Sequence, residues 1–236
     1  MSGELEQRLA GIRGRMEQAC LKAGRAADSV RLLAVSKTHG PDAVMEASAA
    51  GLADFGESRI QEARQKIPQC SGSLRWHFIG HLQSNKVREA VRLFEFIHAV
   101  DSPRLLEHLE RLCQEEGRRL SVCLEVNVSG ERSKFGMQPG DVPAALRTAA
   151  GCFRVKVEGL MTIPPIAEDP AEARPFFRAL RGLRDRMQEE SGVPLPELSM
   201  GMSHDFEVAI EEGATWVRVG TSLFGPRRKG VPDEAV

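Results

Sequence analysis

The sequence contains no tyrosine, and its five cysteines are scattered without a Cys-x-x-Cys pair. This pattern disfavours a disulfide framework or a zinc site and favours reduced thiols in the cytoplasm. The 32 basic and 33 acidic side chains nearly cancel, whereas a nucleic-acid-binding protein needs a basic surface. No apolar run approaches the ~18 residues of a membrane span, and no signal-peptide pattern opens the sequence. We therefore expect a cytoplasmic protein that binds neither nucleic acid nor membrane.

The chain does contain a regular alternation of two kinds of segment. Helix-like segments separate eight apolar, β-branched stretches, which are Val30–Ser36, Asp54–Glu57, Trp76–Gly80, Phe94–Val100, Leu120–Val128, Lys156–Thr162, Glu197–Met202 and Trp216–Gly220. Such alternation predicts an α/β protein with a parallel sheet and right-handed crossovers. An open doubly wound sheet would bring a glycine-rich fingerprint after its first strand, and none follows here. Eight strands favour a closed (β/α)₈ TIM barrel.

A barrel of this kind occupies roughly 250 residues, so the 236 residues are expected to form a single domain. Apolar residues at Leu5, Leu9 and Ile12 have helical spacing, which predicts an extra N-terminal helix within about residues 1–28. The polar segment 226–236 is expected to be a flexible tail. Since no exposed apolar seam is evident, we expect a monomer.

In such barrels the working groups gather at the carboxyl ends of the strands. The strand ends of this sequence offer a lysine and several hydroxyl residues beside glycines, with few acids: Lys37, Glu57, Ser58, His81, Asp101, Asn127, Met161, Thr162, Met202, Ser203, Gly220 and Thr221. Clustered metal ligands are absent from this set, so no metal is expected. The set suits an anionic ligand that backbone amides and hydroxyl groups would hold.

Lys37 is the most informative of these residues because it follows an apolar strand instead of lying on a helix. Partial desolvation at a barrel mouth would lower the pKa of its amine and permit imine formation. The alternative is a lysine that ends the strand in solvent or pairs with a carboxylate. From position alone, this alternative is the more frequent of the two. Glu57 could likewise be a base or a carboxylate that ties down a loop.

The loops after the seventh and eighth strands are a frequent phosphate site in barrels, and they carry Ser203, Gly220 and Thr221. Ser203 could instead cap the following helix. Arg218 lies two residues before Gly220 and so shares its side of the strand, although the inward and outward orientations remain equally open. His81 could be a ligand or a hydrogen-bonded structural histidine, and Met161 could simply fill the core or the pocket.

Several ordered motifs between about Val30 and Arg228 resemble those of the pyridoxal phosphate homeostasis proteins. The motifs are Leu33-Ala34-Val35-Ser36-Lys37-Thr38, Asp54-Phe55-Gly56-Glu57, Trp76 to Lys86, Gly159-Leu160-Met161-Thr162, Ser199 to Glu207 and Trp216 to Gly225. The resemblance implies a barrel like the N-terminal domain of alanine racemases. It also implies pyridoxal 5′-phosphate (PLP) as a Schiff base on Lys37. By matching motifs, Ser203, Gly220 and Thr221 would hold the phosphate, and Arg218 would face the pyridine nitrogen.

Ser58, His81 and Met161 complete the set of residues that we expect to contact the cofactor. The sequence departs from the family pattern at two places. Gly56-Glu57-Ser58-Arg59 stands where Gly-Glu-Asn-Tyr is common, and His204 stands where a small or acidic residue is usual. The contacts that the asparagine amide and the tyrosine ring make in the family are therefore in question for this chain. A histidine near the phosphate could strengthen anion binding or face solvent.

Members of the resembled family are regarded as non-enzymatic carriers or regulators of vitamin B6, with PLP-dependent apoenzymes as possible partners. The main alternative is a PLP-dependent amino-acid racemase, which would use a lysine and a tyrosine from a second domain. This chain has no tyrosine and ends soon after the eighth strand. A class I aldolase and an interaction module with a silent Lys37 are further alternatives. We expect no catalytic residues.

Overall fold

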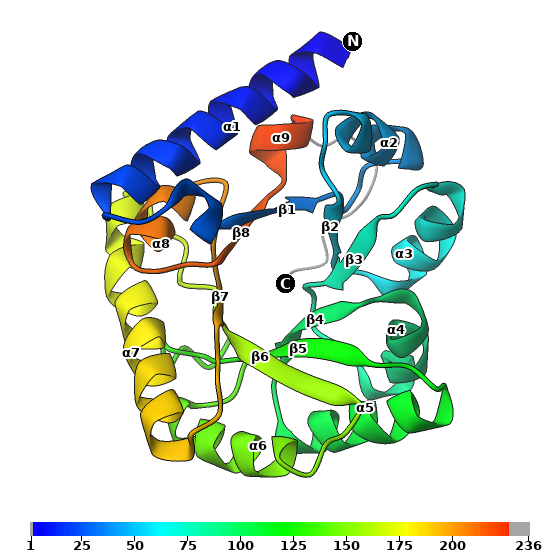
Figure 1. Cartoon of the computed structure of the whole chain (residues 1–236), viewed down its shortest axis with the longest axis vertical. Helices are drawn as coiled ribbons and strands as arrows, with labels where there is room; N and C mark the ends of the chain where they lie inside the picture. Colours follow the sequence, from blue (N-terminus) through cyan, green and yellow to red (C-terminus); the bar gives the residue numbers. More distant parts are fainter. Residues whose placement is uncertain (1, 227–236) are drawn as a thin grey trace.

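A computed structural model describes residues 2–226. Its eight strands form a closed barrel in chain order, and every neighbouring pair is parallel. The strands are β1 (Arg31–Val35), β2 (Asp54–Glu57), β3 (Arg75–Phe78), β4 (Phe96–Val100), β5 (Leu120–Glu125), β6 (Val155–Met161), β7 (Glu197–Met202) and β8 (Trp216–Val219). Figure 1 shows this ring with helices around its outside. The predicted (β/α)₈ barrel is confirmed.

The predicted strands match the observed ones except near some of their ends. Most predicted strands run one to three residues past an observed end. For Phe94–Val100 and Leu120–Val128 the reason is that local hydrogen bonds compete with the sheet. Phe94 ends the preceding helix, since its N–H donates to the Ala90 carbonyl at 3.0 Å. Beyond Glu125 the chain turns at Asn127, whose side-chain oxygen accepts the N–H of Gly130 at 3.0 Å. Side chain-to-backbone bonds of this kind favour turns over strands.

Helices cover the outside of the barrel. They are α1 (Ser2–Lys22), α2 (Pro41–Ala49), α3 (Ile60–Lys66), α4 (Val87–Leu93), α5 (Pro103–Glu115), α6 (Val142–Ala149), α7 (Arg174–Ser191), α8 (Phe206–Glu211) and α9 (Thr221–Phe224). None of the described helices is both long and apolar enough to span a membrane.

The predicted N-terminal helix is α1, which lies outside the ring beside α8 and α9 (Figure 1). Its apolar stripe, including Leu5, Leu9 and Ile12, is buried. The Arg8 side chain donates to the Leu223 carbonyl at 2.8 Å, which ties α1 to the segment after β8. Apart from Pro226, the tail for which we predict flexibility lies outside the described residues.

The interior of the barrel is unusually polar. A large apolar core lies between strands and helices, whereas the separate cluster formed by Ala99, Cys123 and Met161 is small. His98 on β4 and Ser199 on β7 are fully buried, and their side chains hydrogen-bond at 2.8 Å. Since β4 and β7 are not neighbours in the ring, this bond crosses the barrel. Such interiors are usually filled by branched aliphatic side chains.

Candidate functional site

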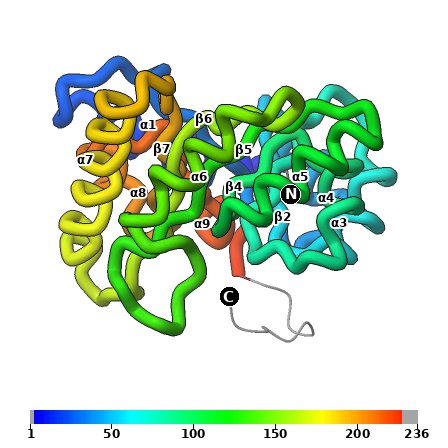
Figure 2. Tube along the Cα trace, turned by 90° about the horizontal axis from the view of Figure 1, so that it is seen from below, coloured from blue at the N-terminus to red at the C-terminus, as the bar shows by residue number. Residues whose placement is uncertain are grey.

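A cavity of about 380 Å³ lies at the carboxyl ends of the strands. Figure 2 shows α9, which follows β8, and the loop between β5 and α6 on this same side of the barrel. Seven of the eight residues predicted to contact a cofactor line the cavity: Lys37, Ser58, His81, Ser203, Arg218, Gly220 and Thr221. The structure therefore brings together residues that are spread over five strand ends.

Met161 is the predicted residue that does not line the cavity. It is fully buried in the small inner cluster, and its carbonyl accepts the N–H of Val126 at 2.8 Å. Ile163, two residues further along, lines the cavity instead. Residues two apart in extended chain share a face. Met161 thus lies one layer below the cavity. Of the two places that the sequence left open for it, the core and the pocket, the structure shows the core.

A buried ionic network fixes the chain immediately before Lys37. One carboxylate oxygen of Glu57 accepts hydrogen bonds from Ser36 Oγ at 2.6 Å and from Lys66 Nζ at 2.7 Å. Lys66 Nζ also donates to the Ser36 carbonyl at 2.8 Å and to Glu62 at 2.7 Å. Of the two roles open for Glu57, the structure therefore favours the structural one. Ser36 is bonded through its side chain and its backbone, so Lys37 starts from a fixed position.

The environment of Glu57 is unfavourable for its charge. Burial raises the pKa of Glu57 to about 7, although the nearby Lys66 ammonium acts in the opposite direction. The second carboxylate oxygen of Glu57 is buried without a hydrogen-bond partner among the described residues. A buried pair of this kind loses stability sharply when one member is removed. The network is thus a sensitive support for the segment that carries Lys37.

Thr38, directly after Lys37, has an unusual backbone conformation. Its φ of 69° lies in the left-handed region, which is rare for a β-branched residue. Conformations of this kind persist where the surroundings impose them, and they cluster at functional sites. Here the Thr38 N–H donates to the Glu62 carboxylate at 2.7 Å. The same carboxylate that binds Lys66 therefore also holds the strained residue.

The loops after β7 and β8 meet on the other side of the cavity. The Gly220 N–H donates to Ser203 Oγ at 3.3 Å. Ser203 does not cap α8, whose N-cap residue is Asp205. Gly220 also approaches β1, since a Cβ on it would stand 3.2 Å from the Val35 carbonyl oxygen. The Ser203 hydroxyl and the Gly220 and Thr221 backbone thus lie together at the predicted phosphate position.

Arg218 points inward, which settles the orientation that the sequence left open. Its side chain is only 4% exposed. Nη1 donates to Ser199 Oγ at 2.8 Å, and Nη2 donates to the Thr162 carbonyl at 3.0 Å. Burial lowers its pKa. Within residues 2–226 it forms no ion pair with a carboxylate. A buried cation of this kind, at the wall of a cavity that Lys37 also lines, fits an anionic ligand or a ligand with a hydrogen-bond acceptor.

Sequence reasoning missed two kinds of residue in the cavity wall. Glu125 is buried at the end of β5, and burial raises its pKa to about 7. Lys134 and Phe135 come from the loop after β5. The Phe135 ring stacks on His81 with centroids 4.1 Å apart, and His81 Nδ1 lies 3.4 Å from Asp101. Glu125 was hidden because the predicted strand ran on to Val128, and no local pattern marks the loop residues.

The two departures from the family pattern occupy different places. Ser58 lines the cavity, whereas Arg59 lines a neighbouring pocket that Lys37 also borders. His204 lines the cavity and is exposed, and its Nε2 lies 3.0 Å from the Glu168 carbonyl oxygen. It therefore holds the loop between β6 and α7 beside the candidate phosphate position.

Comparison with known proteins gives consistent matches over most of the chain. Residues 13–228 match the family model described as the N-terminal domain of alanine racemase. A pyridoxal phosphate homeostasis protein of Aquifex aeolicus is 45% identical over 94% of this chain and 98% of its own length. A protein of the same name from Pseudomonas aeruginosa is 44% identical over 97% and 98%.

Among solved structures, PipY of Synechococcus elongatus with PLP bound is similar to most of this chain. It is 41% identical, covers 94% of this chain and 100% of its own, and has a TM-score of 0.83. Barrel, site and relatives together define a protein of the alanine racemase N-terminal domain class. Within that class, the chain belongs to the pyridoxal phosphate homeostasis protein family.

Proposed function

We propose that this chain binds PLP through a covalent link to Lys37 and serves vitamin B6 homeostasis in the cytoplasm as a non-catalytic carrier or regulator. The observation that carries the proposal is the convergence of Lys37, Arg218, Ser203, Gly220 and Thr221 on one cavity. The cavity volume of about 380 Å³ lies in the range of small-molecule sites. The family membership and the PLP-bound relative support the same reading.

Each group of PLP finds a complementary residue in this arrangement. Bound PLP would supply an aldehyde that reacts with amines and a ring that withdraws electrons. Lys37 would present its amine from the fixed end of β1. Ser203, Gly220 and Thr221 would hold the phosphate with a hydroxyl and backbone N–H groups. Arg218 would donate toward the ring nitrogen, because its guanidinium has no competing carboxylate among the described residues.

The absence of tyrosine supports a carrier over a racemase. A two-base racemase of the related fold uses a tyrosine opposite the lysine, and this sequence has none. Exposed His81 and the partly exposed rim leave the cavity accessible to water, which weakens electrostatic catalysis. Access from solvent would instead suit transfer of PLP to apoenzymes, the partners that we propose. We further propose that the protein works as a monomer.

The proposal is tested by titrating cofactor-free protein with PLP while recording visible absorption. We expect stoichiometric uptake by the wild type and no absorbing adduct with Lys37→Ala. Lys134→Ala is the matched control, since Lys134 also lines the cavity, and it should retain the adduct. Wild-type protein that takes up no PLP would overturn the proposal. Rapid racemisation or transamination of common amino acids would overturn the non-catalytic part alone.

A further inference from the structure

A continuous chain of buried polar side chains runs through the barrel to Arg218. It starts at Asp54 on β2, whose Oδ1 lies 3.1 Å from His77 Nε2. His77 Nδ1 lies 3.0 Å from His98 Nε2, and His98 Nδ1 lies 2.8 Å from Ser199 Oγ. Ser199 Oγ in turn accepts from Arg218 Nη1 at 2.8 Å. Every link is a hydrogen bond between side chains of different strands.

The two ends of this chain carry opposite charges. At one end, Asp54 also binds the Arg75 guanidinium through both oxygens, at 2.6 and 2.5 Å. Hydrogen bonds from His77 and Arg75 hold the pKa of Asp54 down at about 2 against the effect of burial. Asp54 is therefore a carboxylate at neutral pH. The other end is the guanidinium of Arg218, which stays protonated in proteins.

These fixed ends determine which atom donates in each link. Because Asp54 can only accept, His77 Nε2 carries a hydrogen, and a neutral His77 then accepts at Nδ1. His98 must donate from Nε2, which leaves its Nδ1 as an acceptor for the Ser199 hydroxyl. Ser199 is then free to accept from Arg218. All donors point from Arg218 toward Asp54, and no donor or acceptor in the links is left unpaired.

The opposite arrangement is less favourable. It would require a charged His77 that donates from both nitrogens and a His98 that donates to Ser199. The Ser199 hydroxyl would then accept twice, and its own hydrogen would have no acceptor among the contacts of the described residues. It would also place a second cation in the same buried interior as Arg218. Burial, followed by repulsion from neighbouring groups that include Arg218, lowers the pKa of His98 well below its ordinary range.

We propose that Asp54, His77, His98 and Ser199 form a positioning relay that orients the Arg218 guanidinium toward the candidate cofactor site. The relay links Arg218 to a distant carboxylate through neutral groups, so the guanidinium is held without an ion pair that would compete for a ligand. Arg218 is the residue that touches the ligand, and the four relay residues act through it. This inference rests on the proposed function for the identity of the ligand as PLP.

The first test reads the relay in cofactor-free protein, independently of PLP. Nitrogen-15 NMR of labelled histidines distinguishes neutral from charged rings and one tautomer from the other. The chain has six histidines, so His77→Gln and His98→Gln spectra would assign the two signals. We expect both rings to be neutral with hydrogen on Nε2 at about pH 7. A charged His77, or hydrogen on Nδ1 of either ring, would overturn the relay.

The second test asks whether the relay acts on the ligand. Ser199→Ala removes the group that joins Arg218 to His98, and we expect PLP to bind roughly tenfold more weakly, as for a lost hydrogen bond to a charged group. The absorption band of bound PLP should also shift. Trp216→Phe is the control, because the Trp216 ring packs 5.0 Å from His77 and 6.1 Å from His98, and its buried Nε1 has no hydrogen-bond partner within residues 2–226.

If Ser199 had a purely structural role, the PLP affinities of the two variants would follow a different pattern. Equal loss of affinity in Ser199→Ala and Trp216→Phe, or none in Ser199→Ala, would contradict the relay. Tenfold weakening confined to Ser199→Ala would support it. If the wild type binds no PLP, the proposed function fails, and the histidine tautomers alone decide whether the relay exists.

Discussion

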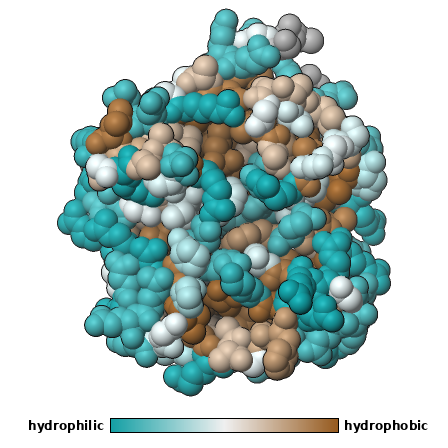
Figure 3. Space-filling view, in the orientation of Figure 1, coloured by the Kyte–Doolittle hydropathy of each residue, from teal (hydrophilic) through white to brown (hydrophobic). Residues whose placement is uncertain are grey.

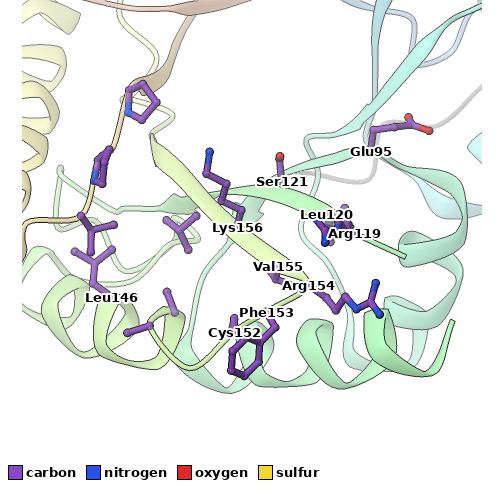
Figure 4. Close-up of a pocket in the computed structure, with 16 residues that line it drawn as sticks. Glu95, Arg119, Leu120, Ser121, Leu146, Cys152, Phe153, Arg154, Val155 and Lys156 are labelled. Atoms are coloured by element: carbon purple, nitrogen blue, oxygen red, sulfur yellow. The ribbon is translucent and has the colours of Figure 1, made fainter. Parts of the chain in front are cut away.

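The two ends of the barrel carry pockets that differ in how their charges are held. The pocket at the amino ends of β5 and β6 has a volume of about 540 Å³ and is larger than the carboxyl-end cavity (Figure 4). Of its charged groups, Glu95, Arg119 and Lys156 are exposed and Arg154 is half-buried. The Phe153 ring, which lines the same pocket, is 84% exposed. Figure 3 shows apolar surface among hydrophilic side chains over this region.

At the carboxyl end, by contrast, the charged groups Glu57, Lys66, Glu125 and Arg218 are buried. Exposed charges are screened and cost little to keep, whereas buried charges persist only when specific partners hold them. The pocket with buried charges is the better candidate for function although it is smaller. This agrees with the general division of such barrels into a functional carboxyl end and a stabilising amino end.

The largest expected effect is that of Lys66→Met at the carboxyl end. It leaves Glu57 buried without its cation, so we expect the free energy of unfolding to fall by about 3–5 kcal/mol at neutral to alkaline pH. PLP affinity should fall as well, because the Ser36 carbonyl loses its hydrogen bond from Lys66. Urea denaturation and PLP titration measure both. Lys22→Met is the control, since Lys22 pairs with Glu211 at an exposed position and should change stability by less than about 1 kcal/mol.

Glu110→Ala tests the amino end. The Glu110 carboxylate accepts hydrogen bonds from the backbone N–H groups of Phe153, Arg154 and Val155, where the chain enters β6. We expect a loss of about 2 kcal/mol in unfolding free energy, because these donors lose their acceptor. PLP affinity should not change. Weaker PLP binding by this variant would contradict the separation of the two ends.

Glu125→Gln should stabilise the protein in a pH-dependent way. The ordinary pKa of a glutamate is near 4.5, and that of Glu125 in the folded protein is about 7. Between these values the unfolded chain has lost a proton that the folded protein still binds, so wild-type stability falls as pH rises. Glutamine avoids this loss. Denaturation curves should show a gain on the order of 3 kcal/mol at about pH 8 that vanishes at about pH 4. An equal gain in stability at both pH values would contradict a raised pKa of Glu125 as the cause.

The smallest effects should come from two exposed phenylalanines, one at each end. Phe135 is 41% exposed and lines the carboxyl-end cavity, whereas Phe153 lines the amino-end pocket. Phe135→Ser should weaken PLP binding by roughly threefold through lost contact area. Phe153→Ser should leave the affinity unchanged, and a comparable loss there would remove the distinction between the pockets.

The sequence predicted the fold well because each β-branched stretch is a local signal. It also placed Lys37, Ser203, Gly220 and Thr221 at strand ends, where barrel geometry makes them converge. Met161 lies in the inner cluster and not in the cavity wall, and nothing in the sequence shows where the inner core ends. Glu125 was passed over because the predicted strand ran on to Val128, whereas β5 ends at Glu125.

The polar relay could not have been predicted. His98 and Ser199 are 101 residues apart, and they meet only because their strands face each other across the ring. Register shifts between β4 and β5 and between β7 and β8 further change which side chains share a layer. Pairings of this kind depend on the closed barrel as a whole and leave no local pattern.

The central claim is that Lys37, held at the carboxyl end by the Glu57–Lys66 network, is the residue that binds PLP. The most direct test is borohydride treatment of the PLP-loaded protein, which makes a carbonyl–amine link permanent, followed by peptide mapping. We predict one modified peptide, with the adduct on Lys37 at close to one per chain. An adduct on Lys134 or on surface lysines, with Lys37 unmodified, would contradict the account.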